Sequence, residues 1–298
     1  MEEGSSVDFY SLPEGCISNI LSLTTPRDAC RSSLVSSIFK SAADSDAVWE
    51  KFLPSDYQDI ISRSVSPFPA LFSSKKDLYL HLCNHTILID EGKKSFALEK
   101  WSGRKCYMVA ARELLIIWGD TPEYWRWISL PESRFSDVAE LLDVFWLEIH
   151  GKMDTQMLSM KTTYAAYLVY KFTEDTYGLG PVEVSVKFVR GGGGGWHTVY
   201  MDSDGSLRRK HQIFQQTGQV RVSSSYTLSF PALAHLVQRK RQLPRERGDG
   251  WIEIEMGEFF NNRGEDGEVE MSLIEVKGGK SKSGLIIQGI ELRPKESK

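Results

Sequence analysis

The spacing of apolar residues changes its period along this chain, and this change constrains the fold more than any other feature. In residues 17–21 apolar side chains recur at positions i, i+3 and i+4, as on one face of an α-helix. In residues 182–188 and 251–256 apolar and polar side chains alternate, as in a β-strand with one buried face. We therefore expect a small helical unit followed by a β-domain.

Further helix starts lie within the first 54 residues. In residues 25–28, Thr25 can cap a helix, Pro26 suits the first helical position and Asp28 is an acidic residue in the first turn. Ser45 or Asp46 can cap a last helix that ends at Pro54. Helices this short bury little apolar surface, so such a unit depends on a partner or on a following domain for its stability.

The middle of the chain is expected to connect the two units. The tract 62–74 is rich in serine and proline, and a helix candidate follows at residues 75–83. We therefore assign residues 8–54 to the helical domain, residues 55–95 to a partly helical connector and residues 96–294 to the β-domain.

The β-domain is expected to be an antiparallel β-sandwich resembling a jelly roll, which makes the whole chain a multidomain protein with an all-α and an all-β part. Segments 144–149 and 164–172 are apolar and rich in β-branched or aromatic residues, as strands buried on both faces are. Asp204-Gly205 is typical of a hairpin turn, and Gly191–Gly195 is typical of a flexible loop between strands. Many short strands separated by turns favour this architecture.

Charge and composition exclude several classes of partner. The net charge is −4, and no basic face of the kind that nucleic acid requires is evident. The longest apolar stretches, such as residues 165–170, are too short to cross a bilayer. Residues 1–3 are acidic where a signal peptide would be basic, and the four scattered cysteines suit a reducing compartment. We expect a protein of the cytoplasm and nucleus, although the basic run 239–241 favours a solvated loop over a nuclear signal.

Sequence motifs for catalysis, cofactors or metals do not emerge. The pentaglycine lacks the Gly-Lys-Ser/Thr that completes a phosphate-binding loop. His81 and His85 are spaced i, i+4, but no second Cys/His pair supplies further ligands at zinc spacing. We therefore expect a protein that is not an enzyme and has no cofactor or bound metal.

Residues 8–54 carry a recognisable order of apolar residues and prolines, which begins with Leu12-Pro13-Glu14 and ends at Trp49. This order resembles the F-box, a helical motif that docks cullin-based ubiquitin ligases through a Skp-type adaptor. The tryptophan usual in the middle helices is replaced near Phe39. An ordinary helical subdomain packed on its own sheet is the alternative. The adaptor-binding residues that the resemblance implies are Leu12, Pro13, Ile17, Ile20, Leu21, Pro26, Leu34, Val35 and Trp49.

Residues 96–294 carry a second set of motifs. Residues 111–114 read AREL and residues 116–127 read IIWGDTPEYWRW, and later segments read ERGDGWIE (246–253), GEFF (257–260) and GIELRP (289–294). They resemble the phloem-lectin domain of phloem protein two and of the jasmonate-induced tobacco lectin. The combination of the two domains is similar to the plant F-box proteins of the phloem-lectin family.

The resemblance implies a sugar site, and the chemistry of saccharides agrees with it. A lectin needs an exposed aromatic ring for the C–H face of a sugar and acceptors for its hydroxyls. The family's site combines tryptophans of the opening motif with later glutamates. In this sequence they match Trp118, Trp125, Glu246 and Glu253, with Glu255 and Glu258 as alternatives. N-acetylglucosamine oligomers or N-glycan cores are the expected ligands, although tryptophans in such an apolar segment are more often core residues.

The resemblance thus implies the substrate-recognition subunit of a cullin-based ubiquitin ligase, which binds a Skp-type adaptor through its helices and a glycan or glycoprotein through its β-domain. One rival is a free-standing lectin whose helices are only structural. Another is a module that has lost its sugar site and binds a protein epitope, since a fold does not guarantee a function.

Overall fold

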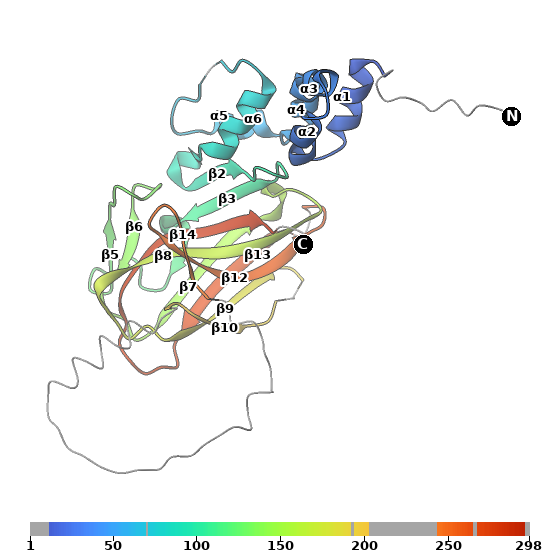
Figure 1. Cartoon of the computed structure of the whole chain (residues 1–298). Helices are drawn as coiled ribbons and strands as arrows, with labels where there is room; N and C mark the ends of the chain where they lie inside the picture. The colour runs from blue at the N-terminus through green and yellow to red at the C-terminus, as the bar shows by residue number, and fades with distance from the viewer. Residues whose placement is uncertain (1–11, 70, 192–193, 203–242, 265–266, 296–298) are drawn as a thin grey trace, which may run out of the picture.

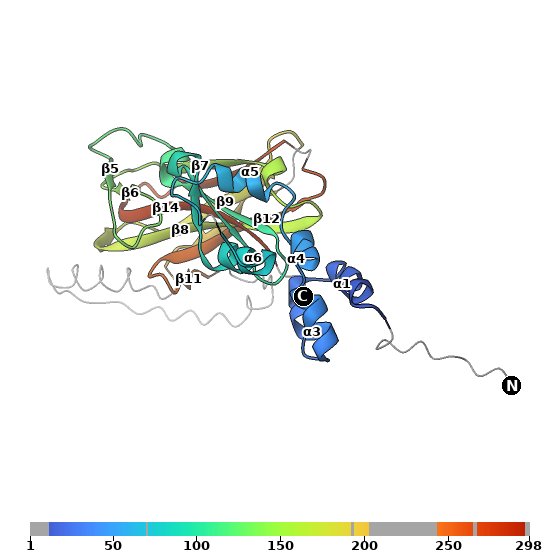
Figure 2. The same cartoon turned by 90° about the horizontal axis from the view of Figure 1, so that it is seen from above.

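The computed structural model describes residues 12–69, 71–191, 194–202, 243–264 and 267–295. Helices form one end of the molecule and two β-sheets form the other (Figure 1). Viewed from above, α5 and α6 lie over the sheets while α1 and α3 project beyond them (Figure 2). The predicted turn at Asp204-Gly205 and the basic run 239–241 lie outside the described residues.

Six α-helices are present in the described part of the chain. Side chains of Thr25, Ser36, Ser45 and Ser74 each cap the helix that follows by accepting a backbone N–H hydrogen bond. The helices are α1 (Glu14–Ser22), α2 (Pro26–Ser32), α3 (Ser37–Asp44), α4 (Asp46–Phe52), α5 (Tyr57–Ser62) and α6 (Lys75–Asn84).

Trp49 is the centre of the helical packing. Its indole Nε1 donates to the carbonyl oxygen of Ala43 at 2.7 Å, which satisfies the one polar atom of a side chain that is otherwise enclosed. Its ring meets the ring of Phe52 edge-on at 5.5 Å and lies 5.1 Å from Tyr79 of α6. The contact between Trp49 and Tyr79 joins the first four helices to the helix of the predicted connector.

The helices are fastened to the β-domain by polar contacts and close packing. The Tyr79 hydroxyl donates to the carbonyl oxygen of Lys100 at 3.0 Å, and Lys105 Nζ pairs with Asp56 at 3.0 Å. Gly103 has φ +70°, and a Cβ there would lie 2.7 Å from the carbonyl oxygen of Phe52. Glycine is therefore required where this loop meets the end of α4.

The strands form two antiparallel sheets. Sheet A has the order β1-β2-β3-β14-β8-β12-β11, with β6 also paired to β14 and β5 paired to β6; sheet B has the order β10-β9-β13-β7-β4. The strands are β1 (Ile87–Ile89), β2 (Lys94–Leu98), β3 (Lys105–Ala110), β4 (Leu115–Ile116), β5 (Trp125–Ile128), β6 (Val138–Leu141), β7 (Leu147–Asp154), β8 (Thr162–Tyr177), β9 (Pro181–Phe188), β10 (His197–Tyr200), β11 (Arg245–Glu246), β12 (Ile252–Asn261), β13 (Glu268–Glu275) and β14 (Ser283–Pro294).

The main core lies between the sheets. Val182, Val184 and Val186 of β9 are buried there, which confirms the strand predicted at residues 182–188. A second, smaller cluster covers the other face of sheet A and includes Phe135 and Trp251. Sheet A is therefore buried on both faces over much of its centre.

The strands expected at residues 164–172 and 251–256 are present in β8 and β12. The segment 144–149 is a strand only from Leu147, because Val144 makes an isolated bridge to Lys282 instead. The sheet begins at Ile87, inside the segment predicted as the connector. Among the described residues no helix is long and apolar enough to span a membrane.

Candidate functional site

The residues predicted to bind an adaptor divide into two groups in the structure. Ile17, Leu21, Pro26 and Trp49 are buried within the helical unit. These four therefore stabilise the unit and are not free to contact a partner, which corrects their assignment as contact residues. Leu12 is half-buried and packs against the core, whereas Pro13 is exposed.

The other predicted residues lie on an exposed apolar surface. Ile20 is on α1, and Leu34 and Val35 form the turn between α2 and α3, where Leu34 is 86% exposed. The sequence did not single out Leu23, which is 87% exposed, or Ile38 of α3 as contact residues. The i, i+3 spacing of Ile20 and Leu23 was the available signal. Ile20, Leu23, Leu34, Val35 and Ile38 are called the apolar docking face below.

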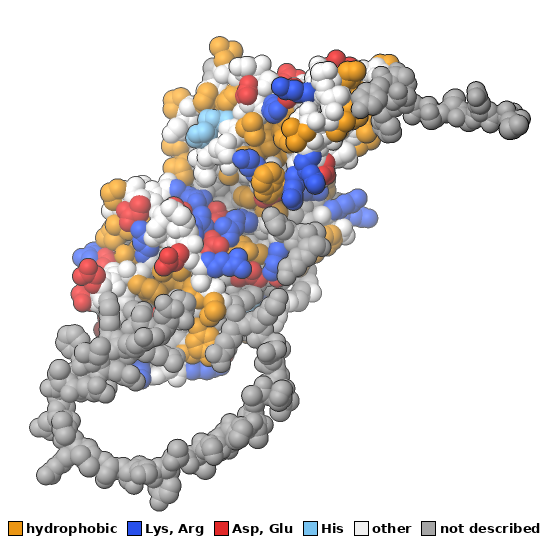
Figure 3. Space-filling model, viewed as in Figure 1, with side chains coloured by type: hydrophobic (Ala, Val, Ile, Leu, Met, Phe, Trp, Pro, Cys, Tyr) orange, Lys and Arg blue, Asp and Glu red, His pale blue; other side chains and the backbone are white. Residues whose placement is uncertain are grey.

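Hydrophobic side chains are visible on the helical end of the molecule in Figure 3. Large aliphatic side chains left this exposed cost free energy in water, and full burial of each would contribute roughly 1.5–3 kcal/mol. The helical unit has already used its inner faces around Ala29, Ala42 and Trp49. The docking face is thus apolar surface that the described residues leave exposed.

Trp118 is exposed and adopts an unusual backbone conformation. It lies in the turn between β4 and β5, its φ is +59°, and it is 47% exposed. Its ring centroid is 5.6 Å from that of Tyr124, which is also exposed. A bulky residue with positive φ is strained, and such strain is concentrated at functional positions. Trp118 is one of the two tryptophans that the family resemblance places in a sugar site.

Trp125 does not share this exposure. It pairs with Leu141 on β5 and is 3% exposed, so its ring belongs to the core and cannot receive a sugar. Trp127, which the sequence analysis did not select, is half-buried: its Nε1 donates to the carbonyl oxygen of Gly119 at 3.0 Å, and the Arg112 guanidinium lies 3.7 Å from its ring centroid. Both residues support the turn that carries Trp118.

Glu253 is part of a buried ion network on the outer face of sheet A. It is 7% exposed, and its carboxylate accepts from Arg247 at 3.0 Å and from Arg293 at 2.8 Å. Arg247 also donates to Glu291 at 2.6 Å, and Arg134 donates to Glu291 at 3.2 Å. Glu253 is therefore occupied by arginines and is not a free acceptor for hydroxyls, contrary to the expectation.

The electrostatics of Glu291 follow from this network. Burial by itself raises the pKa of Glu291, but the charges of Arg134, Arg247 and Arg293 outweigh burial and hold this pKa below its ordinary value. The carboxylate therefore stays ionised at neutral pH and its arginines remain paired.

The remaining glutamates differ in their surroundings. Glu246 is exposed on β11, at the edge of sheet A. Glu255 and Glu258 both pair with Lys295. Glu246 is therefore exposed, whereas Glu253 is buried.

The structure does not bring the predicted tryptophans and glutamates together. One row of paired residues crosses sheet A in the order Trp127, Ala139, Ile287, Tyr170, Ile252 and Glu246. Five strand spacings of about 4.8 Å separate the first residue from the last, so the path measures about 24 Å. Trp127 marks the position of Trp118, because its indole Nε1 donates to the carbonyl oxygen of the neighbouring Gly119. Trp118 and Glu246 therefore belong to different regions of the surface.

A polar chain crosses the outer face of sheet B. Trp146 Nε1 donates to Glu148 at 2.6 Å, His150 Nε2 is 2.7 Å from the other Glu148 oxygen, and His150 Nδ1 is 2.8 Å from Ser272 Oγ. The hydrogen bond from His150, with that from Trp146, lowers the pKa of Glu148. Ser272 is buried in the middle of β13, which does not suit a nucleophile. Within the described ranges no group of three His, Cys, Asp or Glu side chains is placed to hold a metal.

Comparisons with known proteins match both parts of the chain. The family described as "Phloem protein 2" matches residues 104–294, and the F-box domain family matches residues 9–51. The F-box protein PP2-B10 of Arabidopsis thaliana is 44% identical over 294 residues, which cover 98% of this chain and 96% of that protein. The F-box protein PP2-B15 of the same plant is 45% identical over 292 residues, which cover 96% of this chain and 97% of the relative.

Proposed function

Because this chain belongs to the phloem protein 2 family and carries an F-box, we propose that it is the substrate-recognition subunit of a cullin-based ubiquitin ligase. The helical unit binds a Skp-type adaptor and, through it, a cullin. The β-domain binds the target protein and holds it in the ligase complex. Ubiquitin transfer is carried out by other subunits, so no residue of this chain needs to be catalytic.

The main support for the proposal is the apolar docking face. It lies on an F-box whose inner faces are already packed against each other. Leu23 and Leu34 are almost fully exposed, and Ile20, Val35 and Ile38 add to the same end of the helical unit. A few large aliphatic side chains at the centre of an interface supply most of its binding energy. A helical unit that were only structural would have no reason to keep five such side chains in water.

The target is proposed to be a glycan or glycoprotein, with N-acetylglucosamine oligomers or N-glycan cores as the first ligands to test. Support comes from the lectin-like domain and from Trp118 with Tyr124, an exposed aromatic pair held by a strained turn. A protein epitope is the second candidate. It is favoured because Trp125, and to a lesser extent Glu253, are buried and so cannot take part in the expected sugar site. The cytoplasm and nucleus are the proposed compartments, where cullin ligases would meet the chain.

The adaptor role is tested by placing charges on the docking face. The double variant Leu34→Asp/Val35→Asp should lose co-purification with a Skp-type adaptor, because two carboxylates would have to be buried without partners. Both positions are exposed, so the melting temperature should stay that of the wild type.

Leu71→Asp is the matched control, since Leu71 is 92% exposed and lies outside the docking face. It should bind the adaptor normally. Retention of the adaptor by the double variant, at wild-type strength, would show that the docking face is not the contact. Failure of the wild type to bind any Skp-type adaptor would favour the free-standing lectin.

A further inference from the structure

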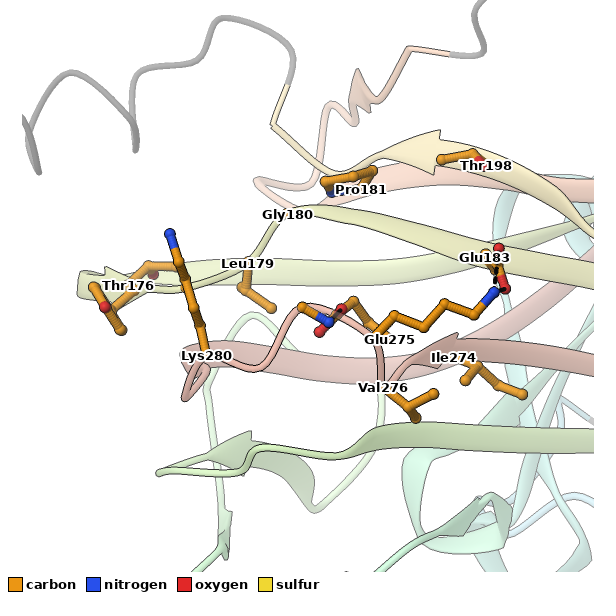
Figure 4. Close-up of a pocket in the computed structure, with 14 residues that line it drawn as sticks. Thr176, Leu179, Gly180, Pro181, Glu183, Thr198, Ile274, Glu275, Val276 and Lys280 are labelled. Atoms are coloured by element: carbon orange, nitrogen blue, oxygen red, sulfur yellow. Dashed lines mark hydrogen bonds and ion pairs between the residues drawn. The ribbon is translucent and has the colours of Figure 1, made fainter.

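A hollow of about 690 Å³ opens on the outer face of sheet B. Its floor is formed by Glu183 of β9, Thr198 of β10 and Ile274 of β13, and its walls are residues 176–181 and 276–280, which connect β8 to β9 and β13 to β14 (Figure 4). The volume lies in the range of about 300–1,000 Å³ that is usual for small-ligand sites.

The walls of the hollow are fixed by the packing of the two connections. Gly178 has φ +71°, and a Cβ there would lie 1.8 Å from the carbonyl oxygen of Ser281, so the first connection rests directly on the second. Glu275 accepts from the backbone N–H of Gly278 at 2.8 Å. Lys282, which is buried, donates to the carbonyl oxygens of Phe145 and Lys280 at 2.8 and 3.0 Å. The hollow is therefore preformed and need not be assembled by a ligand.

The lining offers an apolar wall and accessible polar groups. Leu179, Pro181 and Val276 supply apolar surface close to Ile274. Lys277 Nζ reaches both carboxylate oxygens of Glu183 at 3.4 Å, and the Lys277 side chain is 79% exposed. An exposed ion pair of this length is weak, so either partner can exchange it for a ligand hydrogen bond.

The charges of the lining balance. The hollow is bordered by two acids, Glu183 and Glu275, and by two lysines, Lys277 and Lys280. Each acid is paired with a lysine, Glu183 with Lys277 and Glu275 with the buried Lys282, so the lining does not favour a strongly charged ligand. A purely aliphatic ligand would cover Glu183 and Lys277 without giving them new partners, which is costly. A neutral ligand with hydroxyls on one side and C–H groups on the other satisfies both kinds of surface.

We propose that this hollow binds one or two rings of a neutral saccharide, and this proposal rests on the proposed function of the β-domain in recognising a glycan. The C–H face of a ring, or the methyl of an N-acetyl group, lies against Leu179, Pro181 and Val276. Ring hydroxyls donate to Glu183 and accept from Lys277, while Thr198 contributes its hydroxyl. Glu183 and Lys277 are specificity-determining groups in this arrangement.

The hollow is separate from the exposed Trp118. Trp118 follows β4, and β4 and β10 are the two opposite ends of the order of sheet B. The hollow reaches Ile274 of β13, and two strand spacings of about 4.8 Å separate β13 from β4, so even its nearest part lies about 10 Å across the sheet from the start of the Trp118 turn. Variants at one position therefore leave the other position intact, and the two can be tested independently.

The test uses the full chain on an array of neutral glycans that includes N-acetylglucosamine oligomers, followed by calorimetric titration with the best glycan found. Glu183→Lys removes the acceptor and repels Lys277, and we expect at least a tenfold loss of affinity. Glu183 is 44% exposed, so the melting temperature should not change. Leu179→Asp is a second variant, which removes apolar surface without touching the ion pair and should also weaken binding.

Glu268→Lys is the matched control, because Glu268 is exposed on β13 at the end away from the hollow. It should bind the glycan as the wild type does. Wild-type affinity in Glu183→Lys and Leu179→Asp, or complete loss of binding in Trp118→Ala alone, would overturn the proposal. Binding of no neutral glycan by the wild type would also overturn it.

Adaptor binding by the same variants separates this proposal from the proposed function. Glu183→Lys should retain the Skp-type adaptor while losing the glycan. If the wild type binds a glycan in the hollow but no adaptor, the adaptor role fails and the saccharide site stands.

Discussion

Trp118 and Trp125 flank the same Gly-Asp-Thr-Pro turn but have opposite environments. Trp118 has a positive φ and points out of the fold, whereas Trp125 has entered β5 and lies in the core. The sequence places both tryptophans beside these four residues. It cannot tell which flanking tryptophan is exposed, because that depends on how the turn passes from sheet B to sheet A.

Replacement of each tryptophan should therefore have a different effect. Trp125→Ala should reduce the free energy of unfolding by about 3–5 kcal/mol, because it leaves a cavity in the core. Trp118→Gly should leave stability unchanged or raise it by up to about 1 kcal/mol, since glycine relieves the positive φ. Urea denaturation of both variants measures the difference. A large destabilisation by Trp118→Gly would mean that its ring is structural.

Glu291 connects three arginines, and its depressed pKa gives the ion network a defined pH dependence. A carboxyl whose pKa is lower in the folded than in the unfolded protein stabilises the fold above its unfolded pKa. That contribution is lost as the pH falls through the folded pKa. The network should therefore weaken only in acid, below the ordinary carboxyl range.

Glu291→Gln should be less stable than the wild type by about 3 kcal/mol at pH 7, because it leaves buried arginine charge uncompensated. The deficit should shrink as the pH falls below about 4.3, the ordinary glutamate pKa, because the unfolded wild type then binds a proton that the folded carboxylate, with its lowered pKa, does not. Urea midpoints of both proteins between pH 7 and pH 3 provide the measurement. A deficit that stays constant over this range would show that the charge of Glu291 is unimportant.

At the level of the elements, hydrophobic period predicts strands well where one face of the strand meets water. β9 has a buried face of valines and is predicted correctly from residues 182–188. The same reasoning assigns Glu253 of β12 to an accessible face, wrongly. Its carboxylate is occupied by Arg247 and by Arg293, and Arg293 is 40 residues away in the sequence. Local patterns do not contain contacts at such a separation.

Prediction of the helices from the sequence is limited in the same way, because the sequence does not show which side of a helix packs against its neighbours. Ile17, Ile20 and Leu21 are correctly predicted to lie on a helix. Ile17 and Leu21 face the interior and Ile20 faces water, because α1 packs against α3 and α4 on one side only. The sequence therefore predicts the helical unit but not the division between its core and its docking face.

The connection between β8 and β9 depends on Gly178. In Gly178→Ala the new Cβ would collide with the carbonyl oxygen of Ser281, and the positive φ would be strained. We expect a loss of about 1–3 kcal/mol in the free energy of unfolding and, because the wall of the hollow shifts, weaker glycan binding. Gly180→Ala is the control, since nothing lies within 4 Å of a Cβ there. Equal stability of the two variants in thermal melts would contradict the packing.

At the scale of the whole molecule, helices and sheets share one hydrophobic core rather than two independent ones. Leu78, Tyr79 and Leu82 of α6 belong to the same cluster as Phe96 of β2 and the interior of the sandwich. The predicted connector is therefore part of the folded β-domain, since it supplies β1 and the helix that packs on β2. Serine and proline content predicted a linker here, and the tertiary contacts of α6 override that composition.

This packing predicts how the chain can be shortened. A chain of residues 55–298 keeps α5, α6 and β1, together with the ion pair between Asp56 and Lys105, and should show a β-rich circular dichroism spectrum and a cooperative melt. A chain that begins at Phe96 lacks β1 and the start of β2. It also leaves Lys105, which is 6% exposed, without its carboxylate partner.

The shorter chain should therefore melt at a lower temperature or aggregate, because it exposes apolar surface and leaves a buried charge unpaired. Asp56→Ala in the 55–298 chain isolates the ion-pair contribution from the loss of β1 and α6. If the chains from residues 55 and 96 melt at the same temperature, the first strand and the helices above it contribute nothing to the β-domain. The boundary would then lie at residue 96, as the change in hydrophobic period indicates.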